Sequence, residues 1–143
     1  MNSSELSSSL RAVVSALHKG LRKQLYSVDA YSMTELETIR HLAKNTSLLP
    51  SELATMTRIK TQSMSQILNK LERQDVIKRT TSTEDKRKVY ISLTDSGVKF
   101  VEKARYDRDE WLKEVIEKSL TEDEKKLLAE ALPVLHKLIE TKK

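Results

Sequence analysis

The chain has 143 residues, which suits one domain or a small domain with extensions used for assembly. Its 38% apolar content is too high for a disordered chain, and its two Gly and two Pro favour long helices over an all-β fold. The lack of cysteine excludes disulfides, thiolate metal sites and thiol-based sensing, and no apolar run approaches a signal peptide or the roughly 18 residues of a membrane span. We therefore expect a cytoplasmic protein without membrane contacts.

The N-terminal region predicts a helix over residues 5–25, because apolar residues recur there at helical spacing. The stripe consists of Leu6, Leu10, Val13, Leu17 and Leu21. A helix that lies outside a compact core and carries such a stripe usually buries it against a partner. We therefore predict that this helix contributes to a dimer interface.

Two short helices are expected next. The first starts at one of two capping-box patterns, Ser32 with Glu35 or Thr34 with Glu37. The second is barely two turns long and starts at Pro50, which suits the first position of a helix because the N–H that it lacks would be unpaired there.

A fourth helix is expected over residues 61–74, and its two faces differ sharply. At 100° per residue the apolar residues Met64, Ile67, Leu68 and Leu71 gather on one face. Opposite them lies a polar face that has no acidic residue between positions 61 and 71. Gln and Asn can bond adenine, Lys can reach guanine, and Ser or Thr at a helix N-terminus can bond phosphate. The candidate DNA contacts are Lys60, Thr61, Gln62, Ser63, Ser65, Gln66, Asn69 and Lys70.

The period then changes to two, which predicts a β-hairpin. Residues 89–93 alternate strictly, residues 76–80 are the plausible partner strand, and a charged connection over 81–88 joins them. The tip is cationic and narrow enough for a minor groove, and an ion pair between Asp85 and Arg87 could brace it. The candidate DNA contacts on this wing are Arg79, Asp85, Lys86, Arg87 and Lys88.

The net charge of +5 has its source in this same region. Residues 58–93 contain nine Lys or Arg and four Asp or Glu, whereas the rest of the chain is neutral. A concentrated basic surface is typical of a nucleic-acid-binding protein. The competing interpretations are that the charge serves only solubility, that any amphipathic helix has a polar face, and that the tip is an ordinary solvated turn.

Two further helices are expected after the wing. Thr94 caps a long one that ends near residue 119, and Thr121 with Glu124 starts the last one, in which Pro133 predicts a kink. The last helix carries a second apolar stripe, which we assign to the dimer interface because a two-fold dimer is the simplest closed solution. Its members are Leu128, Leu132, Leu135, Leu138 and Ile139.

The predicted fold is therefore mainly α with a small β-wing (α+β). A winged helix-turn-helix DNA-binding domain occupies residues 32–97. It is preceded by a dimerisation helix within 1–31 and followed by the long helix and a dimerisation helix within 98–143.

Several short motifs resemble those of the MarR family of bacterial regulators. They are Leu53-Ala54, Gln62-Ser63-Met64, Leu71-Glu72, Val76-Ile77, Asp85-Lys86-Arg87 and Leu93-Thr94-Asp95-Ser96-Gly97. The resemblance extends over most of the chain. It implies a homodimer that binds a pseudo-palindromic double-stranded operator through the fourth helix and the wing, usually as a repressor. It also implies release by a small, often aromatic, effector.

The sequence departs from the family pattern at four positions. Asp75 and Arg58 stand where members often carry Gly, Leu49 stands where Ser or Thr is frequent, and Thr61 replaces a frequent Pro. These positions concern caps and turns, not the polar face of the fourth helix.

Two other classes of function compete with this interpretation. An enzyme is not expected, because no nucleophile motif, phosphate loop, cofactor site or metal constellation appears, and the three His residues fall on three different helices. A winged-helix module for protein–protein contact is the alternative, although it would not need a basic face. Trp111 and Tyr106 could line an effector pocket, and packing between helices is the competing role.

Overall fold

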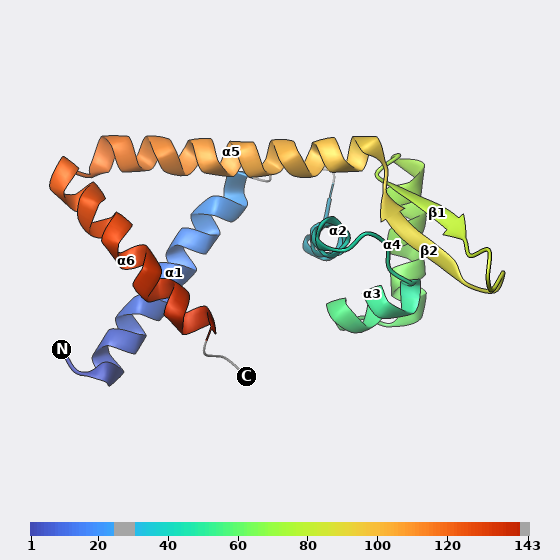
Figure 1. Ribbon diagram of the computed structural model, residues 1–143, viewed down its shortest axis with the longest axis horizontal. Helices are drawn as coiled ribbons and strands as arrows, with labels where there is room; N and C mark the ends of the chain where they lie inside the picture. The colour runs from blue at the N-terminus through green and yellow to red at the C-terminus, as the bar shows by residue number, and fades with distance from the viewer. Residues whose placement is uncertain (25–30, 141–143) are drawn as a thin grey trace.

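The computed structural model describes residues 1–24 and 31–140. The elements follow one another in the predicted order of four helices, a hairpin and two helices, which confirms the fold class (Figure 1). They are α1 (Ser3–Lys23), α2 (Met33–Lys44), α3 (Pro50–Thr57), α4 (Thr61–Arg73), β1 (Ile77–Thr81), β2 (Val89–Leu93), α5 (Asp95–Ser119) and α6 (Glu122–Glu140). The expected end of the first helix at residue 25 lies outside the described residues.

The helix starts follow the capping chemistry of the sequence. At α2 the structure uses the first of the two possible capping boxes: Glu35 N–H donates to the Ser32 hydroxyl, and Ser32 N–H donates to the Glu35 carboxylate. At α6 the predicted box is confirmed, with Thr121 and Glu124 exchanging bonds of 2.9 and 3.1 Å. Helix α6 then continues through Pro133 to its end.

The hydrophobic core lies in the winged helix-turn-helix part of the chain. Its central residues come from α3, α4 and the hairpin, and α2 closes one side. The buried apolar side chains are Ile39, Leu42, Leu48, Leu53, Ala54, Met64, Leu68, Leu71, Val76, Ile77 and Ile91. By contrast, α1 and α6 contribute no buried residue to this core. The fold therefore consists of a packed winged helix-turn-helix unit and helices that retain exposed apolar faces.

The hairpin pairs β1 with β2 in an antiparallel register from Ile77 opposite Leu93 to Thr81 opposite Val89. The first strand thus lies one residue later than the expected 76–80. An additional bridge joins Leu48, just before α3, to Ile91, through N–O contacts of 2.9 and 2.8 Å. This short segment was not predicted from the sequence.

The junction between the hairpin and α5 explains the Leu-Thr-Asp-Ser-Gly motif. Thr94 caps α5 through its bond from Gly97 N–H, and its hydroxyl also donates to the Asp75 carbonyl at 2.5 Å. A Cβ on Gly97 would collide with the backbone carbonyl of Val76. The glycine is therefore required because α5 begins directly against the end of the α4–β1 turn.

Helix α5 spans the long axis of the molecule, with the winged unit at one end and α1 and α6 toward the other (Figure 1). Helix α1 approaches α5 where Gly20 faces the ring of Trp111: a Cβ on Gly20 would lie 2.6 Å from the Cη2 atom of that ring. Trp111 therefore serves helix packing, the role that competed with pocket lining.

Candidate nucleic-acid interface

Helix α4 presents the polar face that the sequence predicts. Met64, Leu68 and Leu71 are buried, which fixes the rotation of the helix on the core. Seven of the eight candidate contacts around this helix are exposed. They are Lys60, Thr61, Gln62, Ser63, Ser65, Gln66 and Asn69. The face therefore offers amide and hydroxyl groups at the surface, where they could meet base edges and phosphates.

The turns at both ends of α4 are left-handed. Arg58 ends α3 at φ 59° and ψ 40°, and Asp75 follows α4 at φ 61°. These are the two positions at which the family resemblance expects Gly, the residue that adopts such angles without steric cost. The chain therefore keeps the geometry of a glycine turn while carrying side chains that strain it.

The wing tip is a compact, hydrogen-bonded turn. The Ser82 hydroxyl accepts the N–H groups of Glu84 and Asp85, both at 3.2 Å, and Lys88 N–H donates to the Asp85 carbonyl at 2.9 Å. No role is assigned to Ser82 from the sequence, although a Ser hydroxyl can stabilise a turn by bonding the backbone two residues on, as it does with Glu84 here. The turn gives the cations of the tip a defined backbone.

The hypothesis that Asp85 braces Arg87 is confirmed by the geometry. The Asp85 carboxylate accepts Arg87 N–H and Nε at 3.1 Å each, and Nη2 at 3.3 Å. These bonds from Arg87 lower the pKa of Asp85. The Arg87 side chain nevertheless stays 91% exposed. The Arg87 side chain is thus oriented by Asp85 and still accessible to a binding partner. Lys86 and Lys88 are exposed as well.

Arg79 connects the wing to helix α4. Its Nη2 donates to the Asn69 side-chain oxygen at 2.8 Å, and its Nε donates to the Glu72 carboxylate at 3.0 Å. The sequence placed Arg79 and Asn69 on separate surfaces and did not assign a role to Glu72. The link depends on β1 folding back beside α4, a contact that residue spacing does not reveal.

Lys70 differs from the other candidates because its ammonium points toward α2. It donates to the Glu35 carboxylate at 2.8 Å, and it lies 5.7 Å from the centre of the Tyr31 ring. Burial raises the pKa of the Tyr31 phenol, an effect that the charge of Lys70 partly opposes. Of the residues predicted to contact DNA on α4, Lys70 is the one that the fold holds in a polar contact with another helix.

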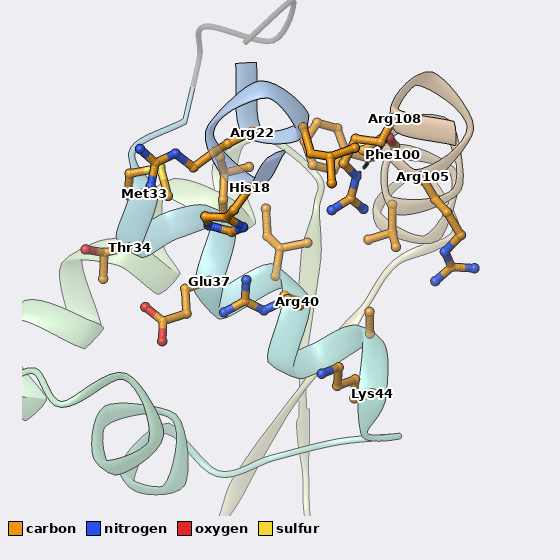
Figure 2. A pocket seen from close by; sticks show the side chains of 16 residues that line it. His18, Arg22, Met33, Thr34, Glu37, Arg40, Lys44, Phe100, Arg105 and Arg108 are labelled. Carbon is orange, nitrogen blue, oxygen red and sulfur yellow. Dashed lines mark hydrogen bonds between the residues drawn. The ribbon is translucent and has the colours of Figure 1, made fainter. Parts of the chain in front are cut away.

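A cavity of about 520 Å³ lies beneath α5, between α1 and α2 (Figure 2). Its apolar wall includes Leu36, Ile39 and Phe100. Among the described residues, five Arg or Lys side chains line the cavity, whereas only one carboxylate does, that of Glu37. The cations are Arg22, Arg40, Lys44, Arg105 and Arg108. Tyr106 is not part of the lining and is largely exposed.

The described residues also bear on metal binding and on membrane spans. Within 1–24 and 31–140, no group of three His, Cys, Asp or Glu side chains could hold a metal ion. No helix in those ranges is long and apolar enough to cross a membrane.

Comparison with known proteins settles the family. A model described as MarR family matches residues 31–88. The HTH-type transcriptional regulator FarR of Neisseria gonorrhoeae is 34% identical over 100 residues, which cover 70% of this chain and 68% of that protein. The chain belongs to the MarR family. It is therefore a DNA-binding transcriptional regulator of the MarR type and not an enzyme.

Two further comparisons agree with this assignment. The HTH-type transcriptional repressor MdtR of Bacillus subtilis is 31% identical over 102 residues, covering 68% of this chain and 66% of MdtR. The crystal structure of a transcriptional regulator protein from Pseudomonas aeruginosa superposes with a TM-score of 0.82 at 28% identity, over 97% of this chain and 96% of that one. The match to this solved structure thus includes the flanking helices as well as the winged unit.

Proposed function

We propose that the protein is a ligand-responsive repressor that acts as a homodimer on a pseudo-palindromic operator. In this proposal α4 lies in the major groove and the wing enters the minor groove. The observation that carries it is the exposed, acid-free face of Gln62, Gln66 and Asn69 beside a cationic tip held in place by Asp85. Such a pairing supplies base contacts and phosphate contacts from one surface. Its place of action would be the cytoplasm.

The dimer is supported by the apolar faces of α1 and α6. Of the ten residues predicted for the interface, seven are exposed in the single chain: Leu6, Val13, Leu17, Leu128, Leu132, Leu138 and Ile139. The other three, Leu10, Leu21 and Leu135, are half-buried. Burial of one exposed Leu contributes about 1.5–3 kcal/mol. A second copy that covered both faces would bury several of these residues at once. The resulting stabilisation would far exceed that from one isolated Leu on the surface.

The dimer can be tested by one substitution. Leu132→Asp places a charge on the apolar face of α6 and is expected to give a monomer in light scattering, with weaker operator binding. Lys126→Asp, an exposed change on the same helix, is the matched control and should leave the assembly intact. A wild-type protein that is monomeric at working concentration would overturn the proposal.

An effector site is supported by the cavity beneath α5. Its volume falls in the range of small-molecule sites, roughly 300–1,000 Å³, and its apolar wall and excess of cations favour a small aromatic anion. We expect benzoate to weaken operator binding more than its neutral amide, benzamide, and we expect Arg40→Gln to remove that difference. Equal effects of the two compounds would contradict an anion site.

The operator itself is the decisive measurement. Selection of bound fragments from the source genome should give one pseudo-palindromic sequence. Gln66→Ala should then cost about 1–3 kcal/mol on that sequence and little on random duplex, because a base contact matters only where the base is present. Equal loss on both would refute base contact by Gln66. Failure to bind any duplex at low salt would favour the protein–protein module instead.

A further inference from the structure

A partly buried ion pair joins the recognition helix to the wall of the cavity. Lys70 of α4 donates to Glu35 of α2 at 2.8 Å, and the exposed fractions of the two side chains are 32% and 12%. The two residues are 35 positions apart in the chain. The helices otherwise pack mainly on other elements, α2 on α3, α5 and β2, and α4 on α3 and β1. The pair is therefore a direct polar connection between two helices with little other shared contact.

The carboxylate of this pair is fixed at the start of α2. The same Glu35 oxygen that accepts Lys70 also accepts Ser32 N–H at 2.9 Å. Because Glu35 is the acidic partner of the capping box, its position depends on the first turn of α2. Met33 and Thr34, in that turn, line the cavity. A ligand that displaced this turn would therefore move the partner of Lys70.

Aromatic rings connect the same ammonium to the other side of the cavity. Lys70 Nζ lies 5.7 Å from the centre of the Tyr31 ring, and Tyr31 meets Phe100 of α5 edge-on, with ring centres 5.2 Å apart. Phe100 lines the cavity. Lys70 is thus connected to α2 through the Glu35 carboxylate, and to α5 through the Tyr31 ring and Phe100.

We propose that the Lys70–Glu35 pair couples the state of the cavity to the position of the recognition helix, so that Lys70 is a positioning residue and not a phosphate contact. The inference rests on the proposed function, in which the cavity controls operator binding. A filled cavity would shift the first turn of α2, weaken the pair and release the middle of α4. The required energetic coupling is of the usual size, because linked sites commonly change each other's affinity about 5- to 150-fold.

The first experiment separates positioning from phosphate contact. Lys70→Met keeps most of the side chain and removes its charge, and Arg73→Met is the matched control at an exposed position of the same helix. Each phosphate contact contributes about 0.9 to the slope of log affinity against log salt. On random duplex we expect the slope of log affinity against log salt to be as steep for Lys70→Met as for Arg73→Met, or steeper. We expect Lys86→Met to make that slope shallower. A Lys70→Met slope flattened as much as that of Lys86→Met would overturn the proposal.

The second experiment measures coupling without a known ligand. Ala104 of α5 lines the cavity, so Ala104→Phe fills part of it, and Ala104→Leu adds less volume in case the larger side chain prevents folding. We expect filling to change operator affinity in the wild-type background by roughly 5- to 150-fold. The same filling should be repeated in two further backgrounds, Lys70→Met and Glu35→Gln, the second of which retains a capping residue. In each of them the change in the logarithm of operator affinity should fall to less than half of its wild-type value.

The outcomes distinguish control of operator binding by the cavity from coupling through the Lys70–Glu35 pair. If filling changes operator affinity equally in all backgrounds, the cavity controls binding and the ion-pair proposal is wrong. If neither Ala104 variant changes operator affinity in the wild type, control by the cavity fails and the coupling fails with it. A loss of the effect in both Lys70→Met and Glu35→Gln supports the proposal.

Discussion

The strained turn before α4 allows a quantitative test of the structure. Arg58 is held at φ 59° and ψ 40°, the left-handed region in which a Cβ approaches the neighbouring carbonyl. For an L-residue this conformation costs about 1–2 kcal/mol. Replacement by Gly removes that cost, but it also gives the unfolded chain more freedom, which offsets about 0.5–1 kcal/mol. Arg58→Gly should therefore increase the free energy of unfolding by about 0.75 kcal/mol at the midpoints of these ranges, and by about 1.5 kcal/mol at most.

The assay is thermal unfolding at equal protein concentration, since the melting temperature of the proposed dimer would depend on concentration. For a chain of this size the expected increase in Tm is about 1–4 °C. Arg58→Ala is the matched control: it removes the same exposed cation but keeps the Cβ and hence the strain. If Arg58→Gly is no more stable than Arg58→Ala, the strain argument is wrong.

Asp75 provides a second comparison, because its turn is equally left-handed while its side chain has a partner. Its carboxylate accepts the Ser96 hydroxyl at 3.3 Å, and Asp tolerates left-handed angles better than Arg. We expect Asp75→Gly to gain less stability than Arg58→Gly. A larger gain at Asp75 would mean that the bond to Ser96 contributes nothing.

Three further predictions concern the junction and the wing. Gly97→Ala should destabilise the protein by about 1–3 kcal/mol because the new Cβ meets backbone, whereas Gly20→Ala, which meets only the tip of a ring, should cost less in the same chemical denaturation. Lys86→Ala should weaken binding to all duplexes and reduce the slope of log affinity against log salt by about 0.9, as seen by fluorescence anisotropy. Asp85→Ala should weaken duplex binding although it makes the protein more positive; unchanged or tighter binding would show that Asp85 does not orient Arg87. Because Arg87 lowers the pKa of Asp85, this brace persists at neutral pH and is lost only as the pH falls through that lowered value.

Features that depend on local chemistry could be predicted from the sequence. The order of elements, the rotation of α4 and the capping box at Thr121 follow from apolar period and capping residues within a few positions of one another. The Asp85–Arg87 brace belongs to the same class, since its partners are two residues apart in a turn. The two choices left open at α2 also show the limit, because Thr34 and Ser32 present equally good local patterns.

Features that depend on how distant elements meet could not be predicted. The bridge between Leu48 and Ile91 has no alternating pattern to mark it, because one residue is too short to show a period. By its spacing Lys70 belongs to the polar face of α4, and only the placement of α2 turns its ammonium toward Glu35. The cavity likewise depends on the spacing of three helices, although the Arg residues that line it are visible in the sequence.

The contact between Arg79 and Asn69 bears on how the proposed base recognition would be divided along α4. The side-chain oxygen of Asn69 already accepts Arg79, so its amide is held in one orientation before DNA arrives. Gln66 lies one turn earlier at an exposed position. An oriented amide reduces the entropy lost on binding, whereas a longer side chain can adapt to more than one base. Asn69 is therefore expected to demand one base at its position of the operator, and the orientation that enforces it comes from the wing.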